Sequence, residues 1–270
     1  MQGRHGGRFL EAPVQGRLAG ADLGGEHPHR PRLGHAAGQH AHDTGHDGVT
    51  VVECGQDAGR ARRVADTIVA AGGRAHVLTA DLGGEPADIR AFAERARDAL
   101  GGTVDILVNN AGVYPGGLTE TVSDEEMQAL WATDIRAPHV LVAELAPRTA
   151  ERGSGVIVNI GSWMARVGVP CKALYPATKA AVEQLTRAWA AEYGPRGVRV
   201  NTVAPGATAT RGTSASADQL AALTKGTPAG SPVRPADIAY AVRFLASDQA
   251  AFVHGATLDV DGGIAATRLR

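Results

Sequence analysis

Two residues four positions apart, Tyr175 and Lys179 in the segment Y-P-A-T-K, are the first candidates for chemistry in this sequence. On a helix, residues four apart lie on one face, so a phenol and an ammonium group lie side by side. A phenol ordinarily titrates near pH ~10, and a nearby cation favours its phenolate form, as general acid or base catalysis requires. The chain has few tyrosines and lysines, so this spacing rarely arises by chance. We interpret the pair as a proton-transfer group; the alternative is an ordinary half-exposed helix pair.

A third candidate, Ser162, follows the apolar segment G-V-I-V-N-I-G at residues 155–161. That segment is typical of a strand buried on both faces, and ligands of open α/β sheets bind at the carboxyl ends of such strands. A serine hydroxyl placed there can donate a hydrogen bond to a substrate carbonyl oxygen. The alternative is a turn or helix cap, which is a common role for serine.

The elements that must position these residues alternate between strands and helices from residue 48 onward. Ser123 and Glu126 have the spacing of a capping box, and we expect the helix that they open to continue toward Leu145. The other expected helices cover residues 57–71, 85–100, 174–193 and 235–247. The expected strands cover residues 49–54, 74–79, 104–109, 155–161, 198–203 and 256–260. This alternation predicts a doubly wound α/β domain, in which helices cover both faces of a parallel sheet in three layers.

Several motifs occur in the order and spacing of one family: N-N-A-G at residues 109–112, a serine at a strand end, Y-x-x-x-K, and P-G at residues 205–206. Together they resemble the short-chain dehydrogenase/reductases, and residues 48–263 follow the family pattern throughout. With its closing D-V-D-G-G at residues 259–263, the chain is most similar to the subgroup of 3-oxoacyl-carrier-protein reductases and sugar or alcohol dehydrogenases. The resemblance implies a Rossmann-type fold and an oxidoreductase that transfers hydride between NAD or NADP and a ketone or secondary alcohol.

The resemblance also implies roles for individual residues. Tyr175 would exchange a proton with the substrate oxygen, Ser162 would polarise and position this oxygen, and Lys179 would favour the phenolate and hold the nicotinamide ribose. Asn109 is expected to be structural. Besides Tyr175 and Lys179, the positions expected to contact the cofactor are Asp81, Leu82, Asn110, Ala111, Gly112, Pro205, Gly206, Thr208 and Thr210. We expect no metal site.

Two positions depart from the family pattern. The fourth catalytic residue of the family is an asparagine, and Asp134 in W-A-T-D-I-R occupies its place. A carboxylate accepts the same hydrogen bonds but donates none, and its charge would act on Lys179. Asp134 is thus a fourth catalytic candidate, against the alternative of a helix-surface residue. At the expected cofactor-selecting strand end, Gln56 stands where relatives often carry arginine, with Glu53 and Arg60 nearby, so the preference between NAD and NADP stays open.

The front of the chain departs most from the pattern. Residues 1–47 hold seven of the ten histidines but few large aliphatic residues, and these histidines lack the spacing of metal ligands. We recognise neither an apolar first strand nor the family motif T-G-x-x-x-G-x-G, because Glu26 takes the third glycine position after Gly20 and Gly24. We interpret residues 1–47 as an out-of-frame reading or a disordered extension, and residues 48–270 as the domain.

Composition narrows the class of partner. A net charge of -1 and a pI of about 6.8 argue against a nucleic acid or an anionic membrane surface. The chain has no apolar run long enough to span a bilayer or to form a signal core, so we expect a soluble cytoplasmic protein that binds a small carbonyl or alcohol substrate. Cys54 and Cys171 lie in no redox or metal spacing, so we expect free thiols.

Substrate and assembly are less well determined by the sequence. The segment between Thr210 and Pro235 covers the substrate in relatives, and here it holds no charged cluster, which argues against strongly anionic substrates. Tyr114 and Trp163 are expected either to border the substrate pocket or to pack in the core. We expect a homodimer or homotetramer, since small residues along the expected helix at 174–193 permit close packing: Ala177, Ala180, Ala181, Ala188 and Ala191.

The competing function is that of a catalytically silent protein of the same fold that cannot bind a dinucleotide. The missing glycine motif favours this alternative, whereas the intact set of Ser162, Tyr175 and Lys179 opposes it.

Overall fold

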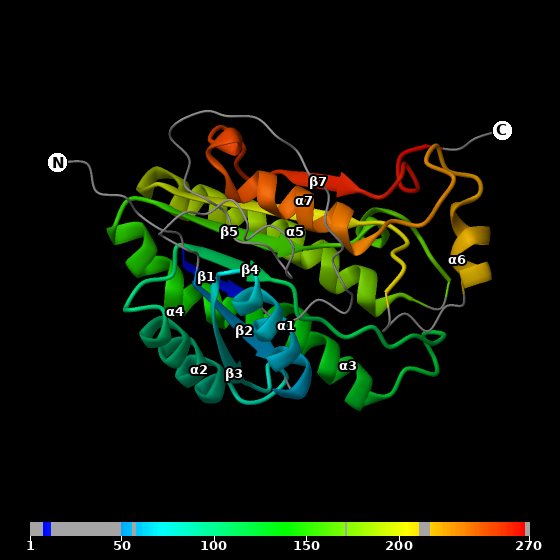
Figure 1. Cartoon of the computed structure of the whole chain (residues 1–270). Helices are drawn as coiled ribbons and strands as arrows, with labels where there is room; N and C mark the ends of the chain where they lie inside the picture. The colour runs from blue at the N-terminus through cyan, green and yellow to red at the C-terminus, as the bar shows by residue number, and fades with distance from the viewer. Residues whose placement is uncertain (1–7, 12–49, 56–57, 171, 211–216, 268–270) are drawn as a thin grey trace.

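The computed structural model describes residues 8–11, 50–55, 58–170, 172–210 and 217–267 (Figure 1). Within these residues one sheet has the strand order β3-β2-β1-β4-β5-β6-β7, and all neighbouring strands are parallel. The strands are β1 Arg8–Glu11, β2 Thr50–Gly55, β3 Arg74–Thr79, β4 Ile106–Asn109, β5 Gly155–Ile160, β6 Val198–Pro205 and β7 Thr257–Val260. Strands β1 to β3 are added toward one edge of the sheet and β4 to β7 toward the other. The strand order thus reverses between β1 and β4, which is the point where doubly wound sheets bind ligands.

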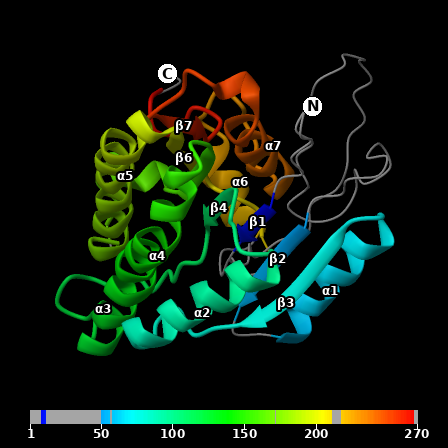
Figure 2. The same ribbon diagram turned by 90° about the vertical axis from the view of Figure 1, so that its left-hand side faces the viewer.

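Helices cover both faces of this sheet. Figure 2 shows α2, α4 and α5 on one side and α1 and α7 on the other, which confirms the three-layer α/β fold. The α-helices are α1 Ala58–Ala70, α2 Pro86–Ala99, α3 Asp124–Leu130, α4 Ala137–Glu151, α5 Leu174–Tyr193, α6 Ala217–Thr224 and α7 Pro235–Ala246. No helix in the described part of the chain is long and apolar enough to cross a membrane.

The expected helix that opens at Ser123 is three consecutive segments. Its capping box is confirmed, because the Ser123 hydroxyl accepts from the Glu126 backbone N–H and the Glu126 carboxylate accepts from the Ser123 N–H. After α3 the chain forms one π-helical segment at Trp131–Arg136 and then continues as α4. A π-helical turn of this kind often marks a functional site.

A strand at the front of the chain corrects the sequence analysis, which recognised none before residue 48. The strand β1, Arg8–Glu11, lies at the centre of the sheet and pairs with both β2 and β4. The segment R-F-L-E has only two apolar residues, too few to stand out as a buried strand. The glycines and histidines noted in residues 1–7 and 12–49, and the side chains of both cysteines, lie outside the described residues.

Two apolar cores hold the layers together. On one face of the sheet, α2 buries Ile89 and Phe92 against α4 and α5. On the other face, Ile238 and Leu245 of α7 pack on β4, β5 and β6. The first core includes Trp189 and Tyr193 and so fixes α5 on the sheet, and the second core packs α7 on the strands whose ends carry candidate residues.

Candidate active site

The candidate residues gather at the carboxyl ends of β4, β5 and β6 and on the first turns of α5. The amide and glycine motif follows β4, Ser162 follows β5, and Pro205 ends β6. Tyr175 and Lys179 lie on α5, which begins at Leu174 as expected.

The ammonium group of Lys179 is almost fully buried, with 5% of the residue exposed. Its Nζ donates to the carbonyl oxygen of Ile160, at 3.3 Å, and lies 3.6 Å from Oδ2 of Asp134. The same Nζ lies 5.6 Å from the centroid of the Tyr175 ring. A cation fixed at this place stabilises negative charge on the neighbouring phenol.

Asp134 belongs to this cluster and not to the helix surface. It sits in the π-helical segment and is 1% exposed. Its Oδ1 accepts from the Val113 N–H at 2.9 Å, and its Oδ2 accepts from the Thr178 hydroxyl at 3.2 Å as well as facing Lys179. The carboxylate thereby ties the loop after β4 to α5. Sequence reasoning did not single out Thr178, although it stands inside the Y-P-A-T-K motif next to Lys179.

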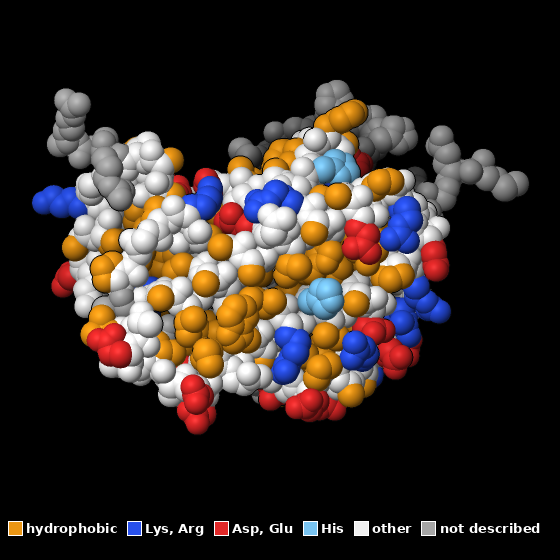
Figure 3. Space-filling model, turned by 180° about the vertical axis from the view of Figure 1, so that it is seen from behind, with side chains coloured by type: hydrophobic (Ala, Val, Ile, Leu, Met, Phe, Trp, Pro, Cys, Tyr) orange, Lys and Arg blue, Asp and Glu red, His pale blue; other side chains and the backbone are white. Residues whose placement is uncertain are grey.

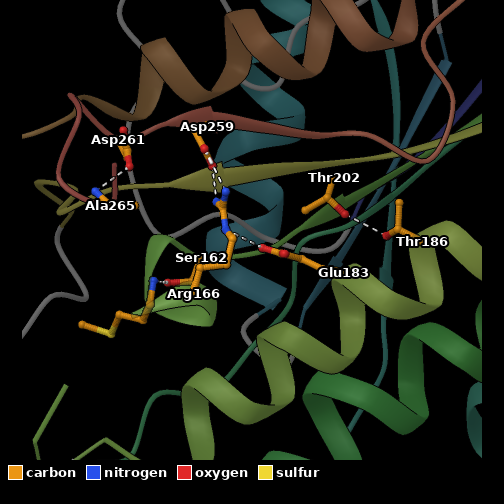
Figure 4. Close-up of polar contacts among 9 residues, drawn as sticks. Ser162, Arg166, Glu183, Thr186, Thr202, Asp259, Asp261 and Ala265 are labelled. Atoms are coloured by element: carbon orange, nitrogen blue, oxygen red, sulfur yellow. Dashed lines mark hydrogen bonds and ion pairs between the residues drawn. The ribbon is translucent and has the colours of Figure 1, made fainter. Parts of the chain in front are cut away.

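Ser162 has the capping role that the sequence left open as one of its two alternatives. It is 6% exposed and caps the short 3₁₀ helix η3, Trp163–Arg166, because its Oγ accepts from the Met164 N–H at 3.2 Å (Figure 4). In this bond the hydroxyl is the acceptor, so its own hydrogen can still be donated to a ligand. Among the described residues no hydrogen bond joins Ser162 to Tyr175.

A buried chain of polar side chains anchors α5 to the sheet behind the site. The Asn109 amide donates to Asn159 at 2.8 Å, and Asn159 in turn donates to the Thr186 hydroxyl at 2.7 Å. The Thr186 hydroxyl donates its hydrogen to the Val182 carbonyl. The Thr202 hydroxyl oxygen lies 2.7 Å from that of Thr186 and must therefore be the donor in this contact, which Figure 4 marks. The chain connects β4, β5, α5 and β6, in agreement with the structural role expected of Asn109.

A second polar cluster lies beside Ser162 (Figure 4). The Arg166 guanidinium binds the Asp259 carboxylate through two nitrogens, and its Nε lies 3.5 Å from the nearly buried carboxylate of Glu183. Burial raises the pKa of Glu183, Arg166 opposes this effect, and Asp259 adds to it. Asp261 accepts from the backbone N–H of Ala265 at 3.0 Å. Together these bonds fasten β7 and the chain after it to η3 and α5.

The two aromatic residues assigned to the pocket border have different surroundings. Trp163 is buried and packs with Leu220 of α6 and with Ile264, so it is a core residue. Tyr114 is 47% exposed, and its ring meets that of Tyr175 edge to face, with centroids 4.4 Å apart. Burial of its hydroxyl, with a smaller effect of Tyr175, raises the pKa of Tyr114. Tyr114 therefore borders the candidate proton-transfer residue.

The space beside the Lys179 ammonium fits the close approach of a dinucleotide. A Cβ added to Gly112 would come within 3.2 Å of both Lys179 Nζ and Asp134 Oδ1, so any side chain there would fill this space. Glycine leaves the backbone at this point open to a ligand beside the ammonium. The residues present therefore fit a nicotinamide cofactor, as the N-N-A-G motif predicts.

The other expected cofactor positions lie at the same edge of the sheet. Thr208 donates to the carbonyl oxygen of Gly206 at 2.9 Å, which folds the chain after β6 into a turn. After β3, Asp81 is exposed and accepts from the Gly83 N–H at 2.9 Å, whereas Leu82 is buried. The remaining positions are half-buried: Asn110, Ala111, Pro205 and Thr210.

Comparison with known proteins identifies the family. A sequence model described as Enoyl-(Acyl carrier protein) reductase matches residues 34–265. The chain belongs to the short-chain dehydrogenase/reductase family. Its relatives include the 2-(S)-hydroxypropyl-CoM dehydrogenase 3 of Xanthobacter autotrophicus, which is 37% identical over 82% of this chain and 88% of that protein. The 3-oxoacyl-[acyl-carrier-protein] reductase of Escherichia coli is 38% identical over 67% of this chain and 74% of that protein.

A solved structure shows the same architecture. The gluconate 5-dehydrogenase from Burkholderia cenocepacia, in complex with NADP and tartrate, has 31% sequence identity and a TM-score of 0.75. The similarity covers 82% of this short-chain dehydrogenase/reductase and 87% of that chain. The protein is thus an oxidoreductase that uses NAD or NADP and acts on a hydroxyl or ketone carbon of a small molecule, as predicted. None of these similarities supports the catalytically silent alternative.

Proposed function

We propose that Tyr175 is the general acid and base of this reaction, with Ser162 and Lys179 as its partners and Asp134 as a fourth catalytic residue. The observation that carries the proposal is the buried Lys179 ammonium, which Ile160 and Asp134 hold beside the Tyr175 ring. Fixing a cation there before the substrate binds stabilises charge that develops on the phenol during proton transfer.

Each residue has one step in the reduction of a ketone. Ser162 donates its hydroxyl hydrogen to the carbonyl oxygen and holds this oxygen toward Tyr175, and the Tyr175 phenol then gives it a proton. Lys179 stabilises the phenolate that remains, while Asp134 holds Lys179 and the Val113 backbone in place. When bound, the cofactor supplies the hydride. Alcohol oxidation follows the same steps in reverse.

The cofactor-holding residues are part of the same proposal. The loop at Asn110, Ala111 and Gly112 would receive the cofactor beside Lys179, with Asp81 and Leu82 on one side of the sheet edge. On the other side we assign Pro205, Gly206, Thr208 and Thr210. Support comes from the glycine at residue 112, where a Cβ would press on Lys179 and Asp134.

Titration of the full chain with NADPH and with NADH, followed by the fluorescence of the reduced nicotinamide, tests this assignment. Saturable binding is expected, and the two dissociation constants give the cofactor preference that the sequence leaves open. Gly112→Val should weaken binding at least tenfold, since the Cβ alone already crowds the site. No binding to a wild-type sample that is folded by circular dichroism would contradict the assignment.

We propose further that the protein is a cytoplasmic homodimer or homotetramer. Support for assembly comes from the face opposite to that of Figure 1, where hydrophobic side chains gather over α4 and α5 (Figure 3). On α5, three of the small residues named above are exposed there: Ala177, Ala188 and Ala191. Light scattering at micromolar concentration tests the assembly, and a monomer would refute it.

Support for the location comes from the near-neutral charge and the absence of paired cysteine spacing.

The division into an atypical segment, residues 1–47, and a domain, residues 48–270, is also a proposal. It rests on the change in composition near residue 48, whereas the pairing of β1 with β2 and β4 joins residues 8–11 to the sheet of the domain. We propose an out-of-frame reading as the cause. If neither other frame of the gene encodes an apolar strand followed by T-G-x-x-x-G-x-G, this cause is excluded.

A further inference from the structure

We infer that Lys172 makes this enzyme selective for ketones and alcohols that carry a carboxylate or another single anionic group close to the reacting carbon. The inference rests on the proposed function, because it places the anion of the substrate relative to Tyr175. It names a residue that lies outside the proton-transfer group and that the motif analysis did not select.

Lys172 and Tyr175 contact the same aromatic ring, that of Tyr114. Its Nζ lies 3.8 Å from the centroid of the Tyr114 ring, and this centroid lies 4.4 Å from that of Tyr175. A cation over an aromatic face is attracted by the ring, so the contact with Tyr114 fixes the ammonium at this place. Because Lys172 and Tyr175 both contact the Tyr114 ring, a positive charge lies in the surroundings of the candidate proton-transfer residue.

The neighbouring backbone leaves room for this lysine. A Cβ added to Gly116 would overlap with Nζ of Lys172 and come within 2.7 Å of its Cε. The lysine chain therefore lies along the backbone of the loop after β4, in the space that a side chain at Gly116 would take. Lys172 stands three positions before Tyr175 in the sequence, and this short spacing is the signal that could have revealed it.

The surface beside this stack is hollowed and mostly apolar. A small hollow is lined by Tyr175 and Lys172 together with apolar or small residues, which include Pro115, Gly116, Val122 and Leu130. Within the part of the chain that the structure describes, Lys172 is the only charged residue of that lining. A charged hydrogen bond from a half-buried ammonium to a carboxylate contributes enough to change affinity by about tenfold or more.

The segment between Thr210 and Pro235 has no charged cluster, which argues against strongly anionic substrates. The structure adds one cation from a different segment, the chain before α5, so the inference concerns substrates with one negative charge. A hydroxy or oxo acid fits this arrangement, with its carboxylate at Lys172 and its oxygen at Ser162 and Tyr175.

The test compares 3-oxobutanoate with its methyl ester, which has the same ketone but no charge. Calorimetric titration of the full chain without cofactor gives both dissociation constants while no turnover occurs. We expect the wild type to bind the acid about tenfold or more tightly than the ester. Lys172→Met should abolish this difference by weakening the acid alone, and Lys172→Arg should keep it. The matched control is Arg243→Met, which removes one exposed cation from α7 on the other side of the sheet.

Three results would overturn the inference: no tighter binding of the acid to the wild type, a difference that survives in Lys172→Met, or an equal weakening of acid and ester in that variant. Steady-state reduction of both compounds with NADPH and NADH then distinguishes a failure of the proposed function from a failure of the inferred selectivity. If binding shows the Lys172-dependent difference but neither compound is reduced, the proposed function fails and the anion subsite stands. If both are reduced with equal kcat/KM, the function stands and the selectivity fails.

Discussion

Replacing Asp134 by alanine is the perturbation whose effect the structure defines best. The carboxylate is fully buried and is the acidic group that faces the buried Lys179 ammonium, at 3.6 Å. With an effective dielectric constant of about 20, two unit charges at 3.6 Å attract each other by about 4 to 5 kcal/mol. Mutations that leave one partner of a buried pair alone cost about 3 to 5 kcal/mol. We therefore expect Asp134→Ala to lower the free energy of unfolding by about 3 to 5 kcal/mol.

The assay is a double-mutant cycle with Lys179→Met, in which urea unfolding is followed by circular dichroism. Each single variant leaves one charge buried without its partner, whereas the double variant removes both. The double variant should therefore be more stable than the two single losses predict, by about 2 to 3 kcal/mol. Asp66→Ala, which removes an exposed carboxylate from α1, is the control and should change stability by less than about 0.5 kcal/mol. A coupling energy below about 0.5 kcal/mol would refute the reasoning.

Two further perturbations test the surroundings of the site by the same urea assay. In Gly206→Ala, the new Cβ would lie 2.5 Å from the Cα of Asp261, so we expect a loss of about 1 to 3 kcal/mol, and an unchanged midpoint would contradict the tight approach. For Glu183→Gln, burial raises the pKa of the Glu183 carboxyl in the folded protein above its unfolded value. The wild type should therefore lose stability relative to this variant as pH rises from the unfolded pKa through the folded one. If the stability of the wild type relative to Glu183→Gln stays constant or increases with pH, the charge of Arg166 offsets the burial of the carboxylate, and this prediction is wrong.

The elements around the catalytic motif could be predicted because their local signals are strong. The helix Leu174–Tyr193 and the strand Arg74–Thr79 have the bounds that their patterns predict, and the Ser123 capping box fixes the start of α3. These signals depend on periodicity and on local hydrogen bonds, which are written in the sequence itself.

Elements that depend on distant partners could not be predicted in this way. The strand Arg8–Glu11 is short and is stabilised by pairing with β2 and β4, which are far away in the sequence. The π-helical segment at Trp131–Arg136 and the helix Ala217–Thr224 were also not predicted. The helix packs through Leu220 onto Trp163, which belongs to another part of the chain.

In the candidate site, too, the residues could be predicted from the sequence but their contacts could not. Tyr175 and Lys179 follow from spacing, and Asp134 from its place relative to the N-N-A-G motif. The contacts of Asp134 with Val113 and Thr178 depend on how the π-helical segment meets α5, so no pattern in the sequence indicates them.

The most direct test of the central claim compares the wild type with Tyr175→Phe in the reduction of 3-oxobutanoate and its methyl ester, followed by loss of the absorbance of NADPH or NADH. Phenylalanine keeps the ring that packs 4.4 Å from Tyr114 but lacks the hydroxyl that transfers the proton. We predict that kcat falls by about 10² to 10⁴-fold, while saturable cofactor binding, measured by fluorescence, persists. A Tyr175→Phe variant with the kcat of the wild type would contradict the assignment of Tyr175 as the proton-transfer residue.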